Sequence, residues 1–216
     1  MTIVASGGVM RPLVDYLLGL TGKDDPAVCF LGTATGDAFV PGFYEAFTGD
    51  RCRPSHVGLF GIPRPDWRDH LLARDLIFVG GGNTASMLAV WRAHGVDQVL
   101  REAWERGIVL AGGSAGAICW FEFGVTDSFR VELDMLDGLG WLPGSCCPHY
   151  DGEEERRPAY QRLLAEGFPP GIAIDDHAAA RFEGTELAEI VTAVEGSTAY
   201  RVEANGETAL EARFVG

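Results

Sequence analysis

The sequence IVLAGGSAGAICWF, at residues 108–121, decides the fold class. It begins with an aliphatic segment typical of a strand buried on both faces, turns through glycines, and continues into a helix-compatible run at residues 117–121. Apolar segments of the same kind recur at residues 3–6, 28–33 and 76–79, and helix-compatible segments lie between them at residues 9–20, 41–47, 86–93 and 97–106. This alternation predicts an α/β fold in which helices cover both faces of a mostly parallel sheet.

The end of the chain has a different pattern. Segments at residues 187–193 and 198–203 are apolar or alternating at strand length, and Asn205-Gly206 then separates two strand-like runs. Asn-Gly between such runs is a strong hairpin signal. We therefore expect antiparallel strands at a sheet edge, and the length of 216 residues fits one domain that spans residues 1–216.

The charge and the residue composition exclude several classes of binding partner. The formal net charge of −14 repels phosphate backbones and anionic lipids, so no nucleic acid and no membrane partner is expected. No apolar run reaches the roughly 18–20 residues that span a bilayer, and the short apolar start lacks the basic region of a secretion signal. The five cysteines include no C-x-x-C pair and suit neither a disulfide framework nor a zinc site. We expect a cytoplasmic protein without a metal.

The glycine-rich turn at residues 112–116 carries the strongest chemical signal. Gly112-Gly113-Ser114-Ala115-Gly116 stands between a predicted strand and a predicted helix, which is the context of a G-x-S-x-G nucleophile elbow. The elbow places a serine on a sharp, strained turn at the end of the sheet, and its glycines let strand and helix approach without Cβ clashes. The alternative is a turn that binds a phosphate or no ligand. The context favours a nucleophilic Ser114.

A second glycine run, Gly80-Gly81-Gly82-Asn83-Thr84, also follows a predicted strand. Its backbone N–H groups can stabilise an oxyanion. The alternatives are a phosphate-binding loop or a simple helix cap, and the dinucleotide pattern G-x-G-x-x-G is not met because Ala85 occupies its last glycine position. Since ligands bind at the carboxyl ends of strands in open sheets, both turns are expected at one crevice.

A nucleophilic serine requires a base and a group that orients it. Among five histidines, His149 follows a short apolar run outside any clear helix, 35 residues after Ser114, which leaves room for a crossover back to the crevice. His177 is the other candidate for the base. Candidate orienters are the Asp175-Asp176 pair at another predicted strand end and Asp127 shortly after the elbow. The short spacing from serine to histidine disfavours an α/β-hydrolase, whose triad runs Ser, Asp, His.

Together these motifs resemble peptidase E, the aspartyl dipeptidases of serine peptidase family S51, which are related to cyanophycinase. The matching pieces follow the family order and lie at residues 80–84, 113–117, 148–150 and 173–176. The resemblance implies a fold similar to class I glutamine amidotransferases, with Ser114 as nucleophile and His149 as general base. It implies an oxyanion hole formed by the N–H groups of Gly82 and Ala115.

The resemblance leaves the orienting acid open. Asp176 falls where the family usually has a glutamate, one methylene longer, and Asp127 matches another acidic position that the family uses near the site. Asp176 is the first choice and Asp127 the reserve.

The resemblance also implies a substrate class. A cofactor-free serine dipeptidase would cleave small peptides, above all dipeptides with an N-terminal aspartate, through an acyl-enzyme. The family's substrate arginine lies in the loop after the histidine, where Arg156 and Arg157 are candidates, and Asn83 is counted with the substrate-binding residues. The alternative for that loop is an acidic helix start with i, i+4 ion pairs.

Two other readings remain open. One is a different amide or ester hydrolase of the same fold, similar to cyanophycinase. The other is a non-catalytic binding or stress protein on an amidotransferase-like fold. The expected partner is a small peptide, and the expected state is a monomer or a homodimer.

Overall fold

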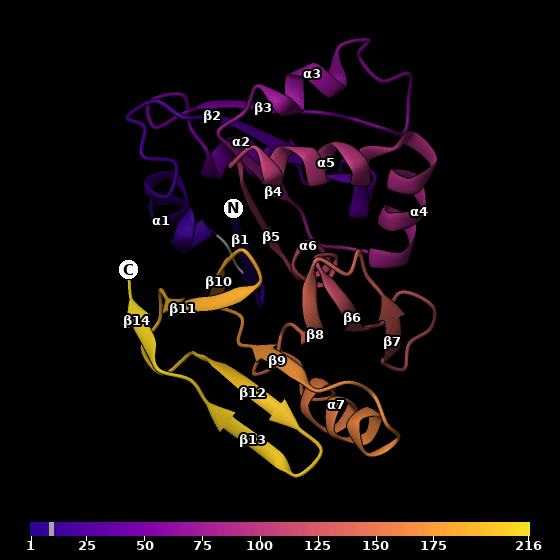
Figure 1. The fold of residues 1–216 in the computed structure, drawn as a ribbon. Coiled ribbons are helices and arrows are strands. Elements are labelled where there is room, and N and C mark those ends of the chain that lie inside the picture. Colours follow the sequence, from indigo (N-terminus) through magenta and orange to yellow (C-terminus); the bar gives the residue numbers. More distant parts are fainter. Residues whose placement is uncertain (9–10) are drawn as a thin grey trace.

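The larger of two sheets forms the centre of the molecule in the computed structural model, which describes residues 1–8 and 11–216 (Figure 1). Five adjacent strands of this sheet are parallel, and their order is β1-β5-β4-β2-β3. Apart from β3, each of these strands coincides with one of the predicted apolar segments. Their bounds are Thr2–Ser6 for β1, Ala27–Leu31 for β2, Arg53–His56 for β3, Leu76–Val79 for β4 and Val109–Gly113 for β5.

A second sheet of six strands lies beside the first, in the order β13-β12-β9-β8-β6-β7. Its middle strands β6, β8 and β9 are parallel. The strands are β6 Phe121–Thr126, β7 Asp134–Asp137, β8 Leu142–Cys147, β9 Gly171–Ile174, β12 Ala199–Glu203 and β13 Gly206–Ala209. The alternation in the sequence predicts parallel strands but not their division between two sheets, because any strand of suitable pattern can pair with any other.

The helix after the elbow is shorter than predicted. Helix α6 covers only Ala115–Ile118, and strand β6 begins at Phe121, where the sequence indicated a helix. The segment Phe-Glu-Phe-Gly-Val-Thr is aromatic and β-branched, and such residues fit the pleated surface of a sheet. The chain therefore passes from the first sheet to the second within a single helical turn.

The remaining helices, apart from α7, cover the larger sheet on both faces, as predicted. They are the 3₁₀ turns η1 Arg11–Leu13 and η2 Thr33–Thr35 and the helices α1 Val14–Gly19, α2 Val40–Ala46, α3 Trp67–Leu72, α4 Thr84–His94, α5 Val96–Glu105 and α7 Arg156–Ala165, the last of which packs on the second sheet. The predicted helix at residues 9–20 begins outside the described residues. The predicted strand at residues 28–33 ends at Leu31, because Thr33 already lies in η2.

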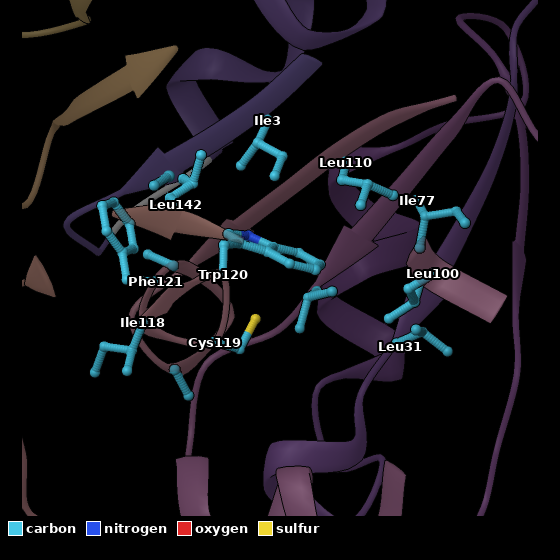
Figure 2. Close-up of a cluster of buried hydrophobic side chains, with 14 of the residues drawn as sticks. Ile3, Leu31, Ile77, Leu100, Leu110, Ile118, Cys119, Trp120, Phe121 and Leu142 are labelled. Atoms are coloured by element: carbon cyan, nitrogen blue, oxygen red, sulfur yellow. The ribbon is translucent and has the colours of Figure 1, made fainter. Parts of the chain in front are cut away.

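Alternate residues of each central strand enter different cores. Ile3, Ile77 and Leu110 face one cluster with helices α4 and α5 and the second sheet, and Figure 2 shows these side chains around Trp120. The opposite face of the same strands packs on Leu17 of α1, Phe43 of α2 and Phe47, the residue that follows α2. Strands buried on both faces explain why their sequences are continuously apolar.

The C-terminal strands pair antiparallel with earlier strands, as predicted. They are divided between the two sheets. Strands β10 Ala178–Glu183 and β11 Glu186–Thr192 extend the larger sheet from β1, and β14 Ala212–Phe214 adds parallel to β11. The predicted hairpin joins β12 and β13, with Glu203 paired to Gly206. It extends the second sheet from β9.

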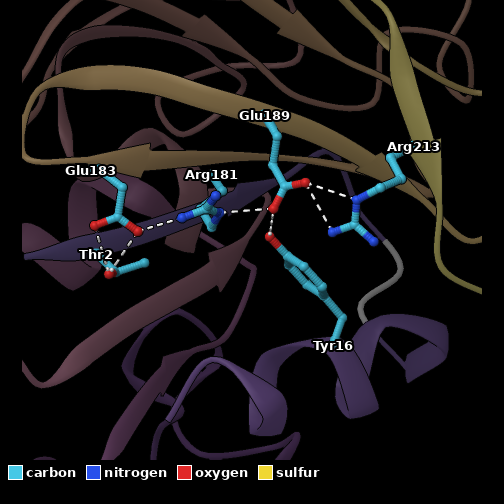
Figure 3. A network of polar contacts seen from close by, with 6 residues as sticks. All are labelled: Thr2, Tyr16, Arg181, Glu183, Glu189 and Arg213. Carbon is cyan, nitrogen blue, oxygen red and sulfur yellow. Dashed lines mark hydrogen bonds and ion pairs between the residues drawn. The ribbon is translucent and has the colours of Figure 1, made fainter. Parts of the chain in front are cut away.

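A polar network fastens α1 to these C-terminal strands (Figure 3). Tyr16 of α1 donates a hydrogen bond of 2.9 Å to Glu189 of β11, which also accepts from Arg181 and Arg213. Burial, followed by the nearby Glu189 carboxylate, raises the pKa of Tyr16, so its hydroxyl remains a donor. The contact holds α1 against β11, and Val14 of the same helix lines the site described below.

Within residues 1–8 and 11–216, none of the helices combines the length and apolar composition that crossing a bilayer requires.

Candidate active site

Ser114 lies at the end of β5, in a conformation that few residues other than glycine adopt. Its φ is 56° and its ψ is −116°, between the last residue of the strand and the first residue of α6. The neighbouring glycines explain the sharpness of this turn. A Cβ at Gly112 would lie 2.2 Å from the carbonyl oxygen of Gly116, and one at Gly116 would lie 2.3 Å from that of Val79. Strand and helix thus meet at backbone contact, as the elbow requires.

His149 reaches Ser114 from the second sheet. It follows β8 by one proline, and its φ of 55° turns the chain back toward β1, where its N–H donates to the carbonyl of Gly7 at 3.2 Å. Its Nε2 lies 2.8 Å from Ser114 Oγ, a hydrogen-bonding distance. The loop after β8 therefore brings the imidazole to the carboxyl end of β5.

Asp176 completes a chain of three groups. It follows β9, and its Oδ1 lies 2.6 Å from His149 Nδ1. The histidine and aspartate side chains are only 22% and 26% exposed, so this short contact is partly shielded from water. The backbone N–H of Asp176 donates to Asp151, which fixes the turn that holds the carboxylate. A neutral imidazole in this setting carries its proton on Nδ1 and accepts from Ser114 at Nε2.

The other candidate acids and the rival histidine lie outside this chain of contacts. Asp175 is buried at 2% exposure and accepts from the N–H of Thr198 instead. Burial raises its pKa to about 6, with a further contribution from the charge of Asp151. Asp127 is exposed after β6, and His177 makes its described hydrogen bonds through its carbonyl, to Thr192 and Ala193.

The predicted oxyanion donors lie on the two glycine turns beside Ser114. Gly82 has a φ of 129°, and a Cβ there would lie 2.4 Å from the carbonyl of Ala34, so only glycine fits. A Cβ on the preceding Gly81 would lie 3.1 Å from Ser114 Cβ, which places this turn against the serine. In the described part of the chain, the N–H groups of Gly82 and Ala115 have no hydrogen-bond acceptor. They are available to an oxyanion formed beside Ser114.

The three residues expected to bind substrate are engaged elsewhere. Asn83 caps α4, because its side chain accepts from the N–H of Ser86 and donates to the carbonyl of Ser128. Arg156 is only 3% exposed, since its guanidinium bonds the carbonyl of Val125 and the carboxylate of Glu153.

Arg157 also has partners of its own and does not line the cavity beside Ser114. It pairs with Glu207 and lies over the rings of Tyr150 and Tyr200. Helix α7, which carries both arginines, lies at the far end of the molecule from α1 and α2 (Figure 1). The loop after the histidine leads to this helix, and neither arginine lines the cavity beside Ser114.

The cavity beside Ser114 instead presents a cation that the sequence did not suggest. It measures about 740 Å³ and is lined by Ser114, His149, the glycines of both turns, Arg11 and several phenylalanines. Arg11 is exposed, and its described contact is a weak 3.5 Å hydrogen bond to the carbonyl of Glu45. Phe39, Phe43 and Phe47 recur every fourth residue, a helical spacing that could have indicated one apolar face.

Among the described residues, no cluster of three or more histidine, cysteine, aspartate or glutamate side chains could hold a metal ion. Cys147 lies two residues before His149, but it is fully buried. Burial raises its thiol pKa to about 12, so it remains protonated and does not compete with Ser114 as a nucleophile.

Comparison with known proteins identifies the family of the chain. The sequence model of peptidase family S51 matches residues 2–190. The chain belongs to peptidase family S51. YgaJ, an uncharacterised peptidase of Bacillus subtilis strain 168, is 47% identical over 210 residues, which cover 93% of this chain and 91% of YgaJ. Peptidase E of Shewanella denitrificans is 31% identical over 123 residues, about 52% of each chain.

Solved structures extend the likeness to the fold. A peptidase from an acI-B1 actinobacterium superposes with a TM-score of 0.71 at 18% identity, covering 98% of this chain and 94% of that one. A protein described as a candidate peptidase E from Listeria monocytogenes EGD-e has a TM-score of 0.67 at 19% identity, covering 87% and 96%. The protein is therefore a peptidase E-like member of family S51, and family membership makes it a peptidase hydrolase.

Proposed function

We propose that this S51 protein is a serine peptidase that hydrolyses small peptides through an acyl-enzyme. The observation that carries the proposal is the unbroken contact chain from Ser114 through His149 to Asp176, at 2.8 and 2.6 Å. A serine hydroxyl is a weak nucleophile until a base accepts its proton, and the base works only in the correct tautomer. This chain of contacts supplies both conditions.

The reaction follows from these contacts. Ser114 Oγ attacks the peptide carbonyl while His149 Nε2 accepts its proton, and Asp176 stabilises the imidazolium that forms. The oxygen of the tetrahedral intermediate accepts hydrogen bonds from the N–H groups of Gly82 and Ala115, each typically worth about 3–4 kcal/mol of transition-state stabilisation. The imidazolium then protonates the leaving amine, and water attacks the resulting ester by the same route.

Dipeptides with an N-terminal aspartate are the first substrates to examine, because the family resemblance implies them. Their side-chain carboxylate needs a cation at the site, since an unpaired carboxylate is costly to desolvate. Arg156 and Arg157 already have partners on α7, whereas Arg11 lines the cavity. We therefore assign the carboxylate-binding role to Arg11 in place of the two arginines.

Fluorophosphonate labelling tests the proposal directly. The wild-type protein should form one adduct, located by peptide mass mapping at Ser114, and Ser114→Ala should form none. Purified wild-type protein should also release amino acids from a dipeptide library, and Ser114→Ala should not. An absence of both labelling and hydrolysis in correctly folded protein would favour a binding protein on this fold.

A further inference from the structure

The turn at residues 80–82 ends in one of the two predicted oxyanion donors, yet it consists of three glycines and has no side chain to hold it in place. Its first N–H group, that of Gly80, donates to the carbonyl of Leu31 at 3.1 Å. Directly after the turn, the N–H of Asn83 donates to the carbonyl of Ala34 at 2.9 Å. A donor stabilises an oxyanion fully only when its direction is fixed before the charge develops. Any further restraint on this turn therefore bears on catalysis.

The two predicted donors differ in how they are held. Ala115 is adjacent to Ser114 in the chain, and backbone contacts at Gly112 and Gly116 fix the elbow around it. Gly82 follows a different strand, β4, and precedes helix α4. Its position relative to the nucleophile therefore depends on how the glycine turn and the start of α4 are packed.

Ser128 restrains the start of α4 from the second sheet. It comes two residues after the end of β6, and its carbonyl accepts a hydrogen bond of 2.9 Å from Nδ2 of Asn83. Its Oγ accepts a second hydrogen bond, of 3.3 Å, from the N–H of Ala85. The first N–H groups of a helix have no partner within the helix, and the side-chain oxygen of Asn83 serves that of Ser86. Ser128 thus supplies the acceptor that the helix itself cannot give to Ala85.

Ser128 is itself anchored. Thr126, the last residue of β6, is only 2% exposed, and its Oγ1 lies 2.7 Å from Ser128 Oγ. The same Oγ1 accepts a hydrogen bond of 3.1 Å from the N–H of Ser128. A hydroxyl has one donor and two acceptor sites, so Ser128 can donate to Thr126 while it accepts from Ala85. The contacts therefore run without a break from a buried strand end of the second sheet to the residues that follow Gly82.

We propose that Ser128 is a positioning residue, which keeps the N–H group of Gly82 directed at the oxyanion by holding Asn83 and Ala85. The inference rests on the proposed serine peptidase function. Ser128 does not line the cavity beside Ser114, so it acts only through the donor that it holds. Loss of its hydroxyl should therefore weaken binding of the transition state and leave binding of the substrate unchanged.

Diisopropyl fluorophosphate tests the inference without requiring the natural substrate. Ser114 Oγ bonds to phosphorus, the P–F bond breaks, fluoride leaves and His149 takes the hydroxyl proton, while the phosphoryl oxygen occupies the oxyanion position. Removal of a whole oxyanion donor typically costs about 10²–10³-fold in rate. Ser128→Ala moves the donor without removing it, so we expect inactivation to be only about tenfold slower than in the wild type.

Three more variants identify the contact responsible. Ser128→Thr retains the hydroxyl and should restore most of the wild-type rate. Asn83→Ser keeps a capping oxygen at the start of α4 but removes the amide that donates to Ser128, so it should slow inactivation as Ser128→Ala does. Ser86→Ala is the matched control, because Ser86 is exposed in the same helical turn and its Oγ has no hydrogen-bond partner among the described residues. It should react at the wild-type rate.

Two readouts separate positioning from general loosening of the site. The pH dependence of the inactivation rate reports the titration of the base, and its midpoint should be the same in Ser128→Ala as in the wild type, because the contacts of His149 are untouched. On a cleaved dipeptide, Ser128→Ala should lower kcat about tenfold and keep KM within about twofold of the wild-type value. A loosened site would shift both the midpoint and KM.

Three results would overturn the inference. They are inactivation of Ser128→Ala at the wild-type rate, a shifted midpoint in its pH profile, and equal slowing in Ser86→Ala. Failure of the wild-type protein to form an adduct at Ser114 would instead contradict the proposed function itself, and the inference with it.

Discussion

Replacing Gly152 with alanine should damage catalysis through Asp176 without touching the nucleophile. Gly152 lies in the exposed loop after His149, and a Cβ there would lie 1.9 Å from Asp176 Oδ2. Carbon and oxygen rarely approach closer than about 3.0–3.4 Å. The carboxylate must therefore move by roughly 1.1–1.5 Å, which breaks its 2.6 Å contact with His149.

A displacement of this size in a catalytic group costs about 10²-fold in rate. We expect Gly152→Ala to lower kcat by about that factor with little change in KM, because Gly152 does not line the cavity beside Ser114. The assay is steady-state kinetics on a cleaved dipeptide, with the melting temperature as a check on folding. Gly61→Ala is the matched control, since Gly61 is also an exposed loop glycine and its added Cβ meets no atom within 4 Å.

A double-mutant cycle tests whether Gly152→Ala acts through the carboxylate of Asp176. If the alanine acts by moving the carboxylate, adding Gly152→Ala to Asp176→Asn should cost much less than it costs in the wild-type protein, because residues of one network are not additive. Equal losses in both backgrounds would show that the loop acts by another route. Full activity of the single variant would show that the loop moves instead of Asp176.

The remaining predictions concern single groups. Ser114→Ala should lower kcat by several orders of magnitude with an unchanged melting temperature, and retention of most activity would refute its role. Asp176→Asn should cost on the order of 10⁴-fold in kcat by analogy with the serine protease aspartate, and Asp127→Asn far less, so the reverse ranking in the same assay would move the orienting role. Asp175 has a raised pKa of about 6, so the folded state gains a proton that the unfolded chain has lost between about pH 4 and pH 6. Its contribution to the free energy of unfolding therefore falls across that window, by about 3 kcal/mol at most, and urea unfolding from pH 4 to pH 7 should show this slope in the wild type but not in Asp175→Asn. Arg156→Met should lower the free energy of unfolding by about 1–3 kcal/mol, since it leaves the carbonyl of Val125 without its buried donor, and a change in substrate preference without loss of stability would contradict this account.

The sequence was most informative where local chemistry decides the conformation. The continuously apolar segments became the central parallel strands, because only strands covered on both faces tolerate such runs. The Asn205-Gly206 signal marked a real hairpin between β12 and β13. The glycines of the elbow lie at backbone contacts that no Cβ could share.

The candidate catalytic residues could be named in advance for a related reason. Each of the three residues follows a strand: Ser114 follows β5 of the larger sheet, and His149 and Asp176 follow β8 and β9, adjacent parallel strands of the second sheet whose carboxyl ends lie side by side. Their roles remain proposals, but their mutual contacts agree with that expectation. The family resemblance favoured Asp176 in advance, and in the structure Asp176 contacts His149 whereas the neighbouring Asp175 accepts from the N–H of Thr198, since adjacent residues at a strand end point in different directions.

What the sequence by itself determined is the set of segments, the elbow and the chemistry available at strand ends, because these depend on neighbouring residues and on periodicity. Only the tertiary structure decided how strands divide between two sheets and which side chains meet in the cavity. Arg156 lies seven positions after His149 yet is carried away on α7, whereas Arg11 lies more than a hundred positions earlier and lines the site. Separation along the chain does not set distance in space, since strand pairing and helix packing connect residues through the whole core.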